Sequence, residues 1–262
     1  MVLRAPMNLN PMSDDPCRAW RLASLNMLLG AVFLAAIPAA FVLVHAHPWA
    51  MIVTIPVNAC CFTGLFILAH EAIHGTLLPE YPRLGHVLGR VFASVYALVD
   101  YDLLRANHVH HHRHVGTTVD PDYDAEGRIL VHAARFMRRY LRWYSVPVLA
   151  LAGHALGQRG FSLAMIGAYV APVLLSTAVV FTVGIHLVHH PVLVAKYAPN
   201  DDQRAVCIDF GRVGSMLLIL NFNTHWLHHA QPRLSWWELG VHRELEPIRV
   251  TPLEAWRVLR WL

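Results

Sequence analysis

The chain has 262 residues, of which 56% are hydrophobic and 15% are charged, and its mean hydropathy is +0.41. This composition excludes an ordinary soluble domain, and the apolar runs are long enough to span a bilayer. The net charge of +4 suits basic residues at the cytoplasmic ends of membrane helices, so no nucleic acid partner is expected. We expect one integral membrane domain over residues 1–262, because no linker, charge block or repeat divides the chain.

Two apolar runs near the N-terminus predict a transmembrane helical hairpin. They extend from Leu22 to Val44 and from Ala50 to Ala69. About 20 residues, at a rise of about 1.5 Å each, cross a hydrocarbon layer of about 30 Å. The motif His70-Glu-Ala-Ile-His74 continues the second run. Its two histidines are four residues apart, so both imidazoles lie on one face of a helix and can bind one ion.

The next segment carries the second histidine cluster. The run Leu84 to Leu104 is apolar, but Arg90, Asp100 and Asp102 oppose a full membrane crossing. We therefore expect a single interfacial or re-entrant helix there. It leads directly into His108-Val-His-His-His112.

A second transmembrane hairpin is predicted in the C-terminal half. Its arms are Tyr144 to Leu156 and Leu163 to Gly184, and it turns at Gln158-Arg159-Gly160. The cluster His186-Leu-Val-His-His190 follows its second arm, and the last cluster is Thr224-His-Trp-Leu-His-His-Ala230.

Arginines indicate the orientation in the membrane. They precede the first span and crowd the segment between the hairpins, at Arg4, Arg18, Arg21, Arg105, Arg113, Arg128, Arg135, Arg138, Arg139 and Arg142. The positive-inside rule then places both termini and all histidine clusters on the cytoplasmic side of the inner membrane. The predicted fold is an all-α integral membrane protein with two transmembrane helical hairpins, about four spans, and a cytoplasmic histidine-rich helical cap.

The clustering of histidines points to metal. Thirteen of the 19 histidines fall in the four clusters when His114 is counted in the second. In each of the triplets beginning at His108 and His225, the second histidine lies one helical turn on, and the third is rotated by about 100°. Such triplets can bind two ions. Neutral imidazole suits iron, zinc and copper, and a redox role favours iron.

The three motifs, of the forms HxxxH, HxxHH and HxxHH, resemble the histidine boxes of the membrane fatty acid desaturase and hydroxylase superfamily. The runs Thr63 to Thr76, His108 to His114 and Asp120-Pro-Asp-Tyr123 are most similar to bacterial-type β-carotene ketolases. The third box departs from the family pattern, with Leu227 where glutamate is common, and Glu71 replaces an aspartate usual in ketolases.

The resemblance implies a non-haem diiron oxidoreductase, an oxygenase that uses dioxygen to attack C–H bonds of a lipid-soluble substrate. It places the chain in lipid metabolism, with carotenoid biosynthesis first and acyl or other alkyl desaturation or hydroxylation as the alternative. The implied iron ligands are His70, His74, His108, His111, His112, His189, His225, His228 and His229. His186 or His190 could replace His189, whereas His110 and His114 are expected to be neighbours of the ligands.

Polar residues near the boxes could orient the ligands. The candidates are Glu71, Asp100, Asp102, Asp120, Asp122, Asn221 and Asn223. The chain has no haem, flavin or dinucleotide motif, so an external electron donor such as ferredoxin is implied.

Two other interpretations remain. His70-Glu-Ala-Ile-His74 also fits the H-E-x-x-H motif of zinc peptidases, some of which act inside membranes, but that function leaves two triplets unexplained. A histidine-lined metal transporter would need ligands near the bilayer midplane, whereas these gather in the cytoplasmic segments.

Overall fold

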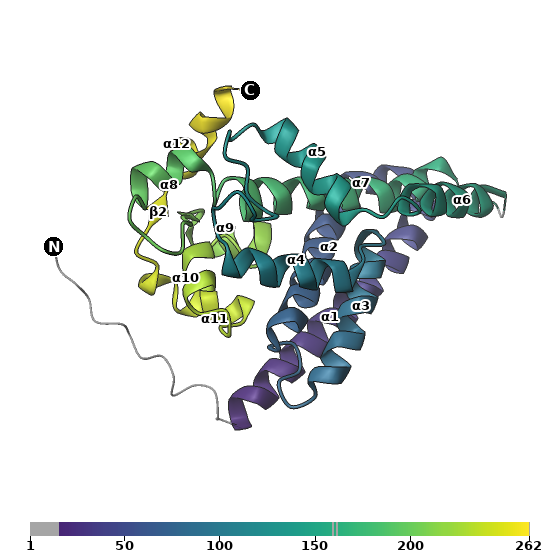
Figure 1. Cartoon of the computed structure of the whole chain (residues 1–262). Coiled ribbons are helices and arrows are strands. Elements are labelled where there is room, and N and C mark those ends of the chain that lie inside the picture. The colour runs from purple at the N-terminus through teal and green to yellow at the C-terminus, as the bar shows by residue number, and fades with distance from the viewer. Residues whose placement is uncertain (1–15, 159, 161, 262) are drawn as a thin grey trace.

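The computed structural model describes residues 16–158, 160 and 162–261, so Arg4 and Arg159 lie outside the described residues. The fold is mostly helical (Figure 1). The first seven helices are α1 (Pro16–Ala46), α2 (Met51–His74), α3 (Pro82–Ala97), α4 (Tyr101–Arg113), α5 (Ile129–Tyr140), α6 (Ser145–Gln158) and α7 (Leu163–Phe181). Shorter helices follow: α8 (Pro191–Tyr197), α9 (Gly211–Ile219), α10 (His225–Ala230), α11 (Trp236–Val241) and α12 (Pro252–Arg257).

Among the described residues, three helical stretches are long and apolar enough to cross a bilayer. They are Cys17–Ala46, Pro48–His74 and Leu163–His186. Large apolar side chains on them face outward, as at Val42, Ile52 and Leu174. These findings support a membrane protein. The predicted arm at Tyr144–Leu156 is helical as α6, but its 14 residues reach only about 21 Å at 1.5 Å per residue, less than the hydrocarbon thickness.

Helix α2 is the centre of the fold, because it packs against α1, α3 and α7. Its second half is buried almost throughout, from Ala59 to Ala72 except Cys60. It ends at Gly75, whose φ of +75° is the left-handed conformation that commonly closes a helix. The end of α2 lies beside α4, and the C-terminal helices gather on the same side (Figure 1).

The expectation of one continuous helix from Leu84 to Leu104 was wrong. The segment forms α3 and α4, with a break at Leu98, Val99 and Asp100. Leu98 adopts φ +53°, and the Asp100 side chain accepts a hydrogen bond from the Leu103 N–H at 3.0 Å, which caps α4. This cap supplies a partner for one of the N–H groups that have none at the start of a helix, so a new helix can begin there.

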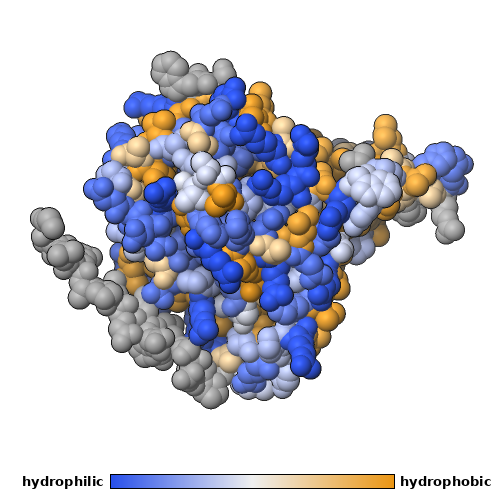
Figure 2. Space-filling model, viewed as in Figure 1, coloured by the Kyte–Doolittle hydropathy of each residue, from blue (hydrophilic) through white to orange (hydrophobic). Residues whose placement is uncertain are grey.

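Two local features complete the fold near the histidines. Helix α7 continues into a π-helical turn, Thr182–His186, which leads to His189. A short parallel pair of strands, β1 (Cys207–Ile208) and β2 (Arg249–Val250), joins the segment before α9 to the C-terminal segment. In Figure 2 hydrophilic residues cover much of the face turned to the viewer, and hydrophobic residues gather toward its margins.

Candidate metal centre

A first group of four histidines converges at the cytoplasm-facing end predicted for α2. One ring nitrogen from each of His70, His74, His108 and His228 lies within 4.8 Å of the others. The Nε2 atoms of His70 and His74 are 2.9 and 2.8 Å from Nε2 of His108. His112 adjoins this group, with its Nε2 3.0 Å from that of His108 and 3.1 Å from that of His228.

A second group lies next to the first. It contains His111, His189, His225 and His229, all buried, again with one ring nitrogen each within 4.8 Å. Nε2 of His229 is 3.1 Å from that of His111 and 3.2 Å from that of His225. Helices α4 and α10 each supply both groups, because adjacent residues on a helix point about 100° apart.

The spacing of the nitrogens fits metal binding. Imidazole nitrogens bind a zinc-sized divalent ion at about 2.1 Å, so two ligands at right angles lie about 3.0 Å apart, and two at the tetrahedral angle about 3.4 Å. The observed separations of 2.8 to 3.2 Å agree with right angles. Ring nitrogens at these separations can bind a common ion.

Burial keeps these imidazoles neutral. It lowers the pKa of His112 to about 2 and that of His189 to about 3, and neighbouring histidines contribute to both shifts. Burial and nearby histidines also hold the pKa of His108, His225, His228 and His229 well below its ordinary value. Neutral imidazoles present lone pairs, so the groups can receive cations without first losing protons.

In three ligand candidates of the second group, Nδ1 donates a hydrogen bond, so the lone pair of Nε2 is left to bind a metal. Nδ1 of His189 donates to the Arg204 carbonyl at 3.0 Å, and that of His225 to the Phe222 carbonyl at 3.3 Å. A carbonyl only accepts, so each Nδ1 carries the proton. Nδ1 of His111 donates to Asp120 Oδ1 at 2.8 Å. The buried Nε2 of His189 has no hydrogen-bond partner among the described residues, as a metal ligand requires.

Asp120 sets His111 apart from the other imidazoles. Burial works to lower the pKa of His111, but the hydrogen bond that it donates to Asp120 and the charges of Asp122 and Asp120 raise this pKa above its ordinary value. Asp120 is itself held by the N–H groups of Gly116 and Asp122, both at 2.8 Å. A carboxylate fixed in this way orients the ring and strengthens its basicity.

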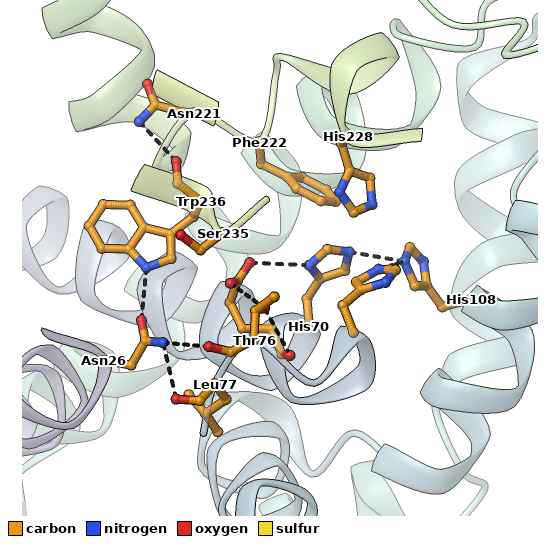
Figure 3. A network of polar contacts seen from close by, with 12 residues as sticks. Asn26, His70, Thr76, Leu77, His108, Asn221, Phe222, His228, Ser235 and Trp236 are labelled. Carbon is orange, nitrogen blue, oxygen red and sulfur yellow. Dashed lines mark hydrogen bonds and ion pairs between the residues drawn. The ribbon is translucent and has the colours of Figure 1, made fainter. Parts of the chain in front are cut away.

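A buried polar network supports the first group (Figure 3). Glu71 Oε1 lies 3.9 Å from Nδ1 of His70, and Glu71 Oε2 accepts a 2.6 Å hydrogen bond from the Thr76 hydroxyl. Asn26 donates to the carbonyls of Thr76 and Leu77 and accepts from the Trp236 indole at 3.1 Å. The network ties α1 and α11 to the end of α2 that carries His70.

Comparison with known proteins agrees with this geometry. The family model described as fatty acid desaturase matches residues 46–162 and 128–251. The chain belongs to the fatty acid desaturase family.

Three curated relatives are ketolases. The chain is 33% identical over 204 residues to a β-carotene 4-ketolase of Protosiphon botryoides, a match that covers 74% of this chain and 51% of that protein. It is 34% identical over 188 residues to a zeaxanthin 4-ketolase of Chlamydomonas reinhardtii, with 70% and 42% covered. It is 30% identical over 204 residues to a β-carotene ketolase of Paracoccus sp. (strain PC1), with 76% and 81% covered. The chain thus spans about half the length of the first two relatives.

Within this desaturase-family chain, the histidine run after α7 contributes one residue to the groups. His189 joins the second group. His190 instead donates from Nε2 to the Gly127 carbonyl and accepts at Nδ1 from the Val192 N–H, so both its nitrogens are engaged. Nδ1 of His186 lies 2.9 Å from Nδ1 of His132, a partner that the sequence did not indicate.

Several predicted supporting residues have other partners. Asp100 caps α4 and pairs with Arg142, and the exposed Asp102 pairs with Arg90. Both carboxylates therefore pair with arginines and not with the proposed ligands. Asn221 donates to the Trp236 carbonyl, while Asn223 donates to the Ile208 carbonyl and the Ser215 hydroxyl, so both amides join backbone segments.

His110 and His114 lie outside both groups. Nε2 of His110 donates to the Val119 carbonyl, and Nδ1 of His114 to the His110 carbonyl.

Three adjoining cavities lead from the histidines into the helices. The inner cavity, about 20 Å³, borders His70, His108, His111, His189 and His225. The middle cavity, about 40 Å³, shares Phe66, Leu104, Phe136 and Tyr140 with the inner one. The outer cavity, about 400 Å³, lies among α1, α6 and α7 and shares Ala97 with the middle cavity.

Two other polar side chains line the inner cavity, Asp122 and Tyr140. The Tyr140 hydroxyl donates to Asp122 Oδ1 at 2.6 Å. Burial raises the pKa of Asp122, against the charge of His111 and the bond from Tyr140. The sequence had suggested Asp122 as a supporting residue but had not suggested Tyr140.

Proposed function

We propose that the protein is an oxygen-dependent diiron membrane oxygenase that converts a ring carbon of a carotenoid to a ketone. The observation that carries this proposal is the pair of histidine groups, set side by side and bordering one cavity. The names of the ketolase relatives support a carotenoid substrate and oxidation to a ketone.

The proposed ligands divide between two ions. His70, His74, His108, His112 and His228 would hold one, and His111, His189, His225 and His229 the other. The number of proposed ligands exceeds what one tetrahedral zinc ion needs, and a redox role favours iron. Two ferrous ions bound here would supply reduction of dioxygen and removal of hydrogen from an unactivated carbon.

The remaining residues orient the ligands and exclude water. Asp120 and the carbonyls of Arg204 and Phe222 fix three imidazoles with Nε2 directed to the group. The rings of Phe66, Phe136 and Phe222 line the inner cavity and keep it apolar. A hydrocarbon held there displaces water from the reacting carbon.

The reaction balances with an external donor. In each round C–H, O₂, two electrons and two protons give C–OH and H₂O. A second round at the same carbon gives a geminal diol, which loses water to form the ketone. The sequence has no haem, flavin or dinucleotide motif, so we propose a separate one-electron donor such as ferredoxin.

The row of cavities is the proposed substrate route. A carotenoid in the bilayer would enter among α1, α6 and α7 and extend through the middle cavity to the histidines. An acyl chain fits the same apolar walls, so acyl or alkyl oxidation is the second candidate. A peptidase is less favoured, because Glu71 accepts from Thr76 and is not among the residues around the inner cavity.

The membrane arrangement is part of the proposal. We propose one domain with about four spans in two hairpins in the inner membrane, with the histidine site and both termini facing the cytoplasm. The exposed arginines of α4 and α5 support this orientation. Since α6 has only 14 residues, its hairpin with α7 would cross with the help of local bilayer thinning.

The test is pigment and lipid analysis of a β-carotene-accumulating bacterial host that expresses the protein. We expect keto carotenoids from the wild type and none from His228→Ala. His110→Ala, outside both histidine groups, is the matched control and should keep its products. Unchanged carotenoids from well-expressed, iron-loaded wild-type protein would refute the carotenoid proposal, and altered acyl chains in that sample would favour the second candidate.

A further inference from the structure

The pair formed by Asp122 and Tyr140 stands apart in the inner cavity. Apart from this pair and the histidines, the residues described around this cavity are apolar. Asp122 is 6% exposed and Tyr140 is 4% exposed, so both residues are buried. A buried polar pair beside the proposed oxidising centre is costly unless it has hydrogen-bond partners, and its hydrogen bond satisfies it only in part.

Both residues are fixed relative to the second histidine group. The Asp122 N–H donates to Asp120 Oδ1, the same oxygen that accepts from His111. Tyr140 is the last residue of α5, and its ring packs on Phe136 with ring centroids 4.4 Å apart. The distance from this pair to the histidines is therefore set by short, rigid connections.

The pair lies where the substrate route meets the histidines. Tyr140 lines both the inner and the middle cavity. A carotenoid that extends through the middle cavity would bring the reacting carbon of its end ring past the Tyr140 ring into the inner cavity. An oxygen added to that carbon would then be within the space that Asp122 and Tyr140 border.

The hydrogen-bonding capacity of the pair distinguishes an alcohol from a ketone. The proton of the Tyr140 hydroxyl is committed to Asp122, whereas a carboxylate has about four lone-pair sites, most of them left open by one donor. A substrate hydroxyl can donate to these sites. A ketone has no hydrogen to donate, and it meets acceptors.

We propose that Asp122, oriented by Tyr140, binds the alcohol formed in the first oxidation, holds its carbon for the second, and releases the ketone. This inference rests on the proposed ketolase function and assigns a determinant of its product. Asp122 touches the substrate oxygen, and Tyr140 is a positioning residue that fixes the carboxylate. Without the pair, the alcohol would leave as readily as the unoxidised substrate.

The test compares Asp122→Asn and Tyr140→Phe with matched controls in the carotene-accumulating host. In Asp122→Asn the amide oxygen can accept from Tyr140, which turns the NH₂ donors toward the cavity. We expect the ratio of alcohol to ketone to rise about tenfold, as the loss of one good hydrogen bond implies. Tyr140→Phe should raise the ratio less, because the carboxylate remains but is no longer fixed.

Two controls separate this role from a structural one. Asp124 is a buried carboxylate two residues on that accepts from Arg135 and the Arg128 N–H. Tyr101 is a buried tyrosine whose hydroxyl pairs with His86 at 2.7 Å. Neither is among the residues described around the three cavities. Asp124→Asn and Tyr101→Phe should leave the ratio at the wild-type value.

Kinetics with supplied substrates add a second readout. In membranes, Asp122→Asn should raise KM for the supplied alcohol about tenfold and leave KM for β-carotene unchanged. An unchanged product ratio and an unchanged KM for the alcohol would overturn the role of the pair while the ketolase function stands. If wild-type protein with iron and a reductant forms no oxygenated carotenoid, the proposed function fails and this inference fails with it.

Discussion

Replacing Asp120 with asparagine should weaken metal binding at the second histidine group and leave the first nearly intact. Asp120 accepts three hydrogen bonds of 2.8 Å, from Nδ1 of His111 and the N–H groups of Gly116 and Asp122. Asparagine keeps one accepting oxygen for His111 and Asp122. Its NH₂ group then faces the Gly116 N–H, so one hydrogen bond is lost and the charge behind the imidazole disappears.

The expected size follows from these contacts. Loss of such a partner of a ligating histidine typically costs about 10- to 100-fold in metal affinity. That factor corresponds to about 1.4 to 2.8 kcal/mol, the same range as about 1.5 to 3 kcal/mol for a hydrogen bond to a charged group. The metal affinity of the first group should change little, because its ligands hydrogen-bond to neither Asp120 nor its loop.

The assay is iron per chain of detergent-purified protein, dialysed against graded concentrations of a chelator. Where the wild type keeps two ions, Asp120→Asn should keep one. Asp102→Asn is the matched control, since this carboxylate also belongs to the α4 region but pairs with Arg90 at the surface. Equal iron retention by Asp120→Asn and the wild type would refute the reasoning about the imidazole, and loss of both ions together would refute the division into two groups.

Three further predictions concern the helices around the site. Ala97→Phe should narrow the junction of the middle and outer cavities and lower turnover severalfold at unchanged iron content; equal turnover would exclude this route. Gly89→Ala should lower the free energy of unfolding by about 1 to 3 kcal/mol, because the added Cβ would lie 2.5 Å from the Tyr101 ring and 2.8 Å from Ala72. An unchanged midpoint of thermal unfolding would count against this packing. Burial raises the pKa of Glu246 from 4.5 to about 8. Between pH 4.5 and pH 8 the folded protein therefore binds more protons than the unfolded chain, and its stability falls as the pH rises through this range. Glu246→Gln should therefore gain stability over the wild type from pH 6 to pH 8 in thermal unfolding, and a difference that does not vary with pH would contradict this.

The sequence predicted the long apolar helices and the grouping of the histidines because both depend on local spacing. In α4 and α10, helical periodicity predicts that a triplet points in two directions. The division differs from the one expected: the first and third histidines share a group and the second joins the other, whereas the sequence had set the third apart. Helical periodicity does not tell which of His186, His189 and His190 turns toward the others, because the π-helical turn before them changes the rotation that a regular helix would give.

Other features depended on contacts between distant parts of the chain. The break at Leu98 was not predicted because the apolar run continues through it, and only the cap by Asp100 shows where α4 starts. Tyr140 has no sequence motif. Its role follows from the approach of α5 to the loop that carries Asp122, a contact between residues 18 positions apart.

Because α4 and α10 each contribute to both histidine groups, a substitution and an insertion in these helices should have different effects on the centre. A point substitution removes one proposed ligand from one ion. One residue inserted inside α10, ahead of His228 and His229, would rotate both by about 100° away from His225, and so would disturb both ions at once. The separation of the two ions is thus set by the pitch of two short helices, and length variation in this protein should be tolerated in its loops and excluded from these few turns.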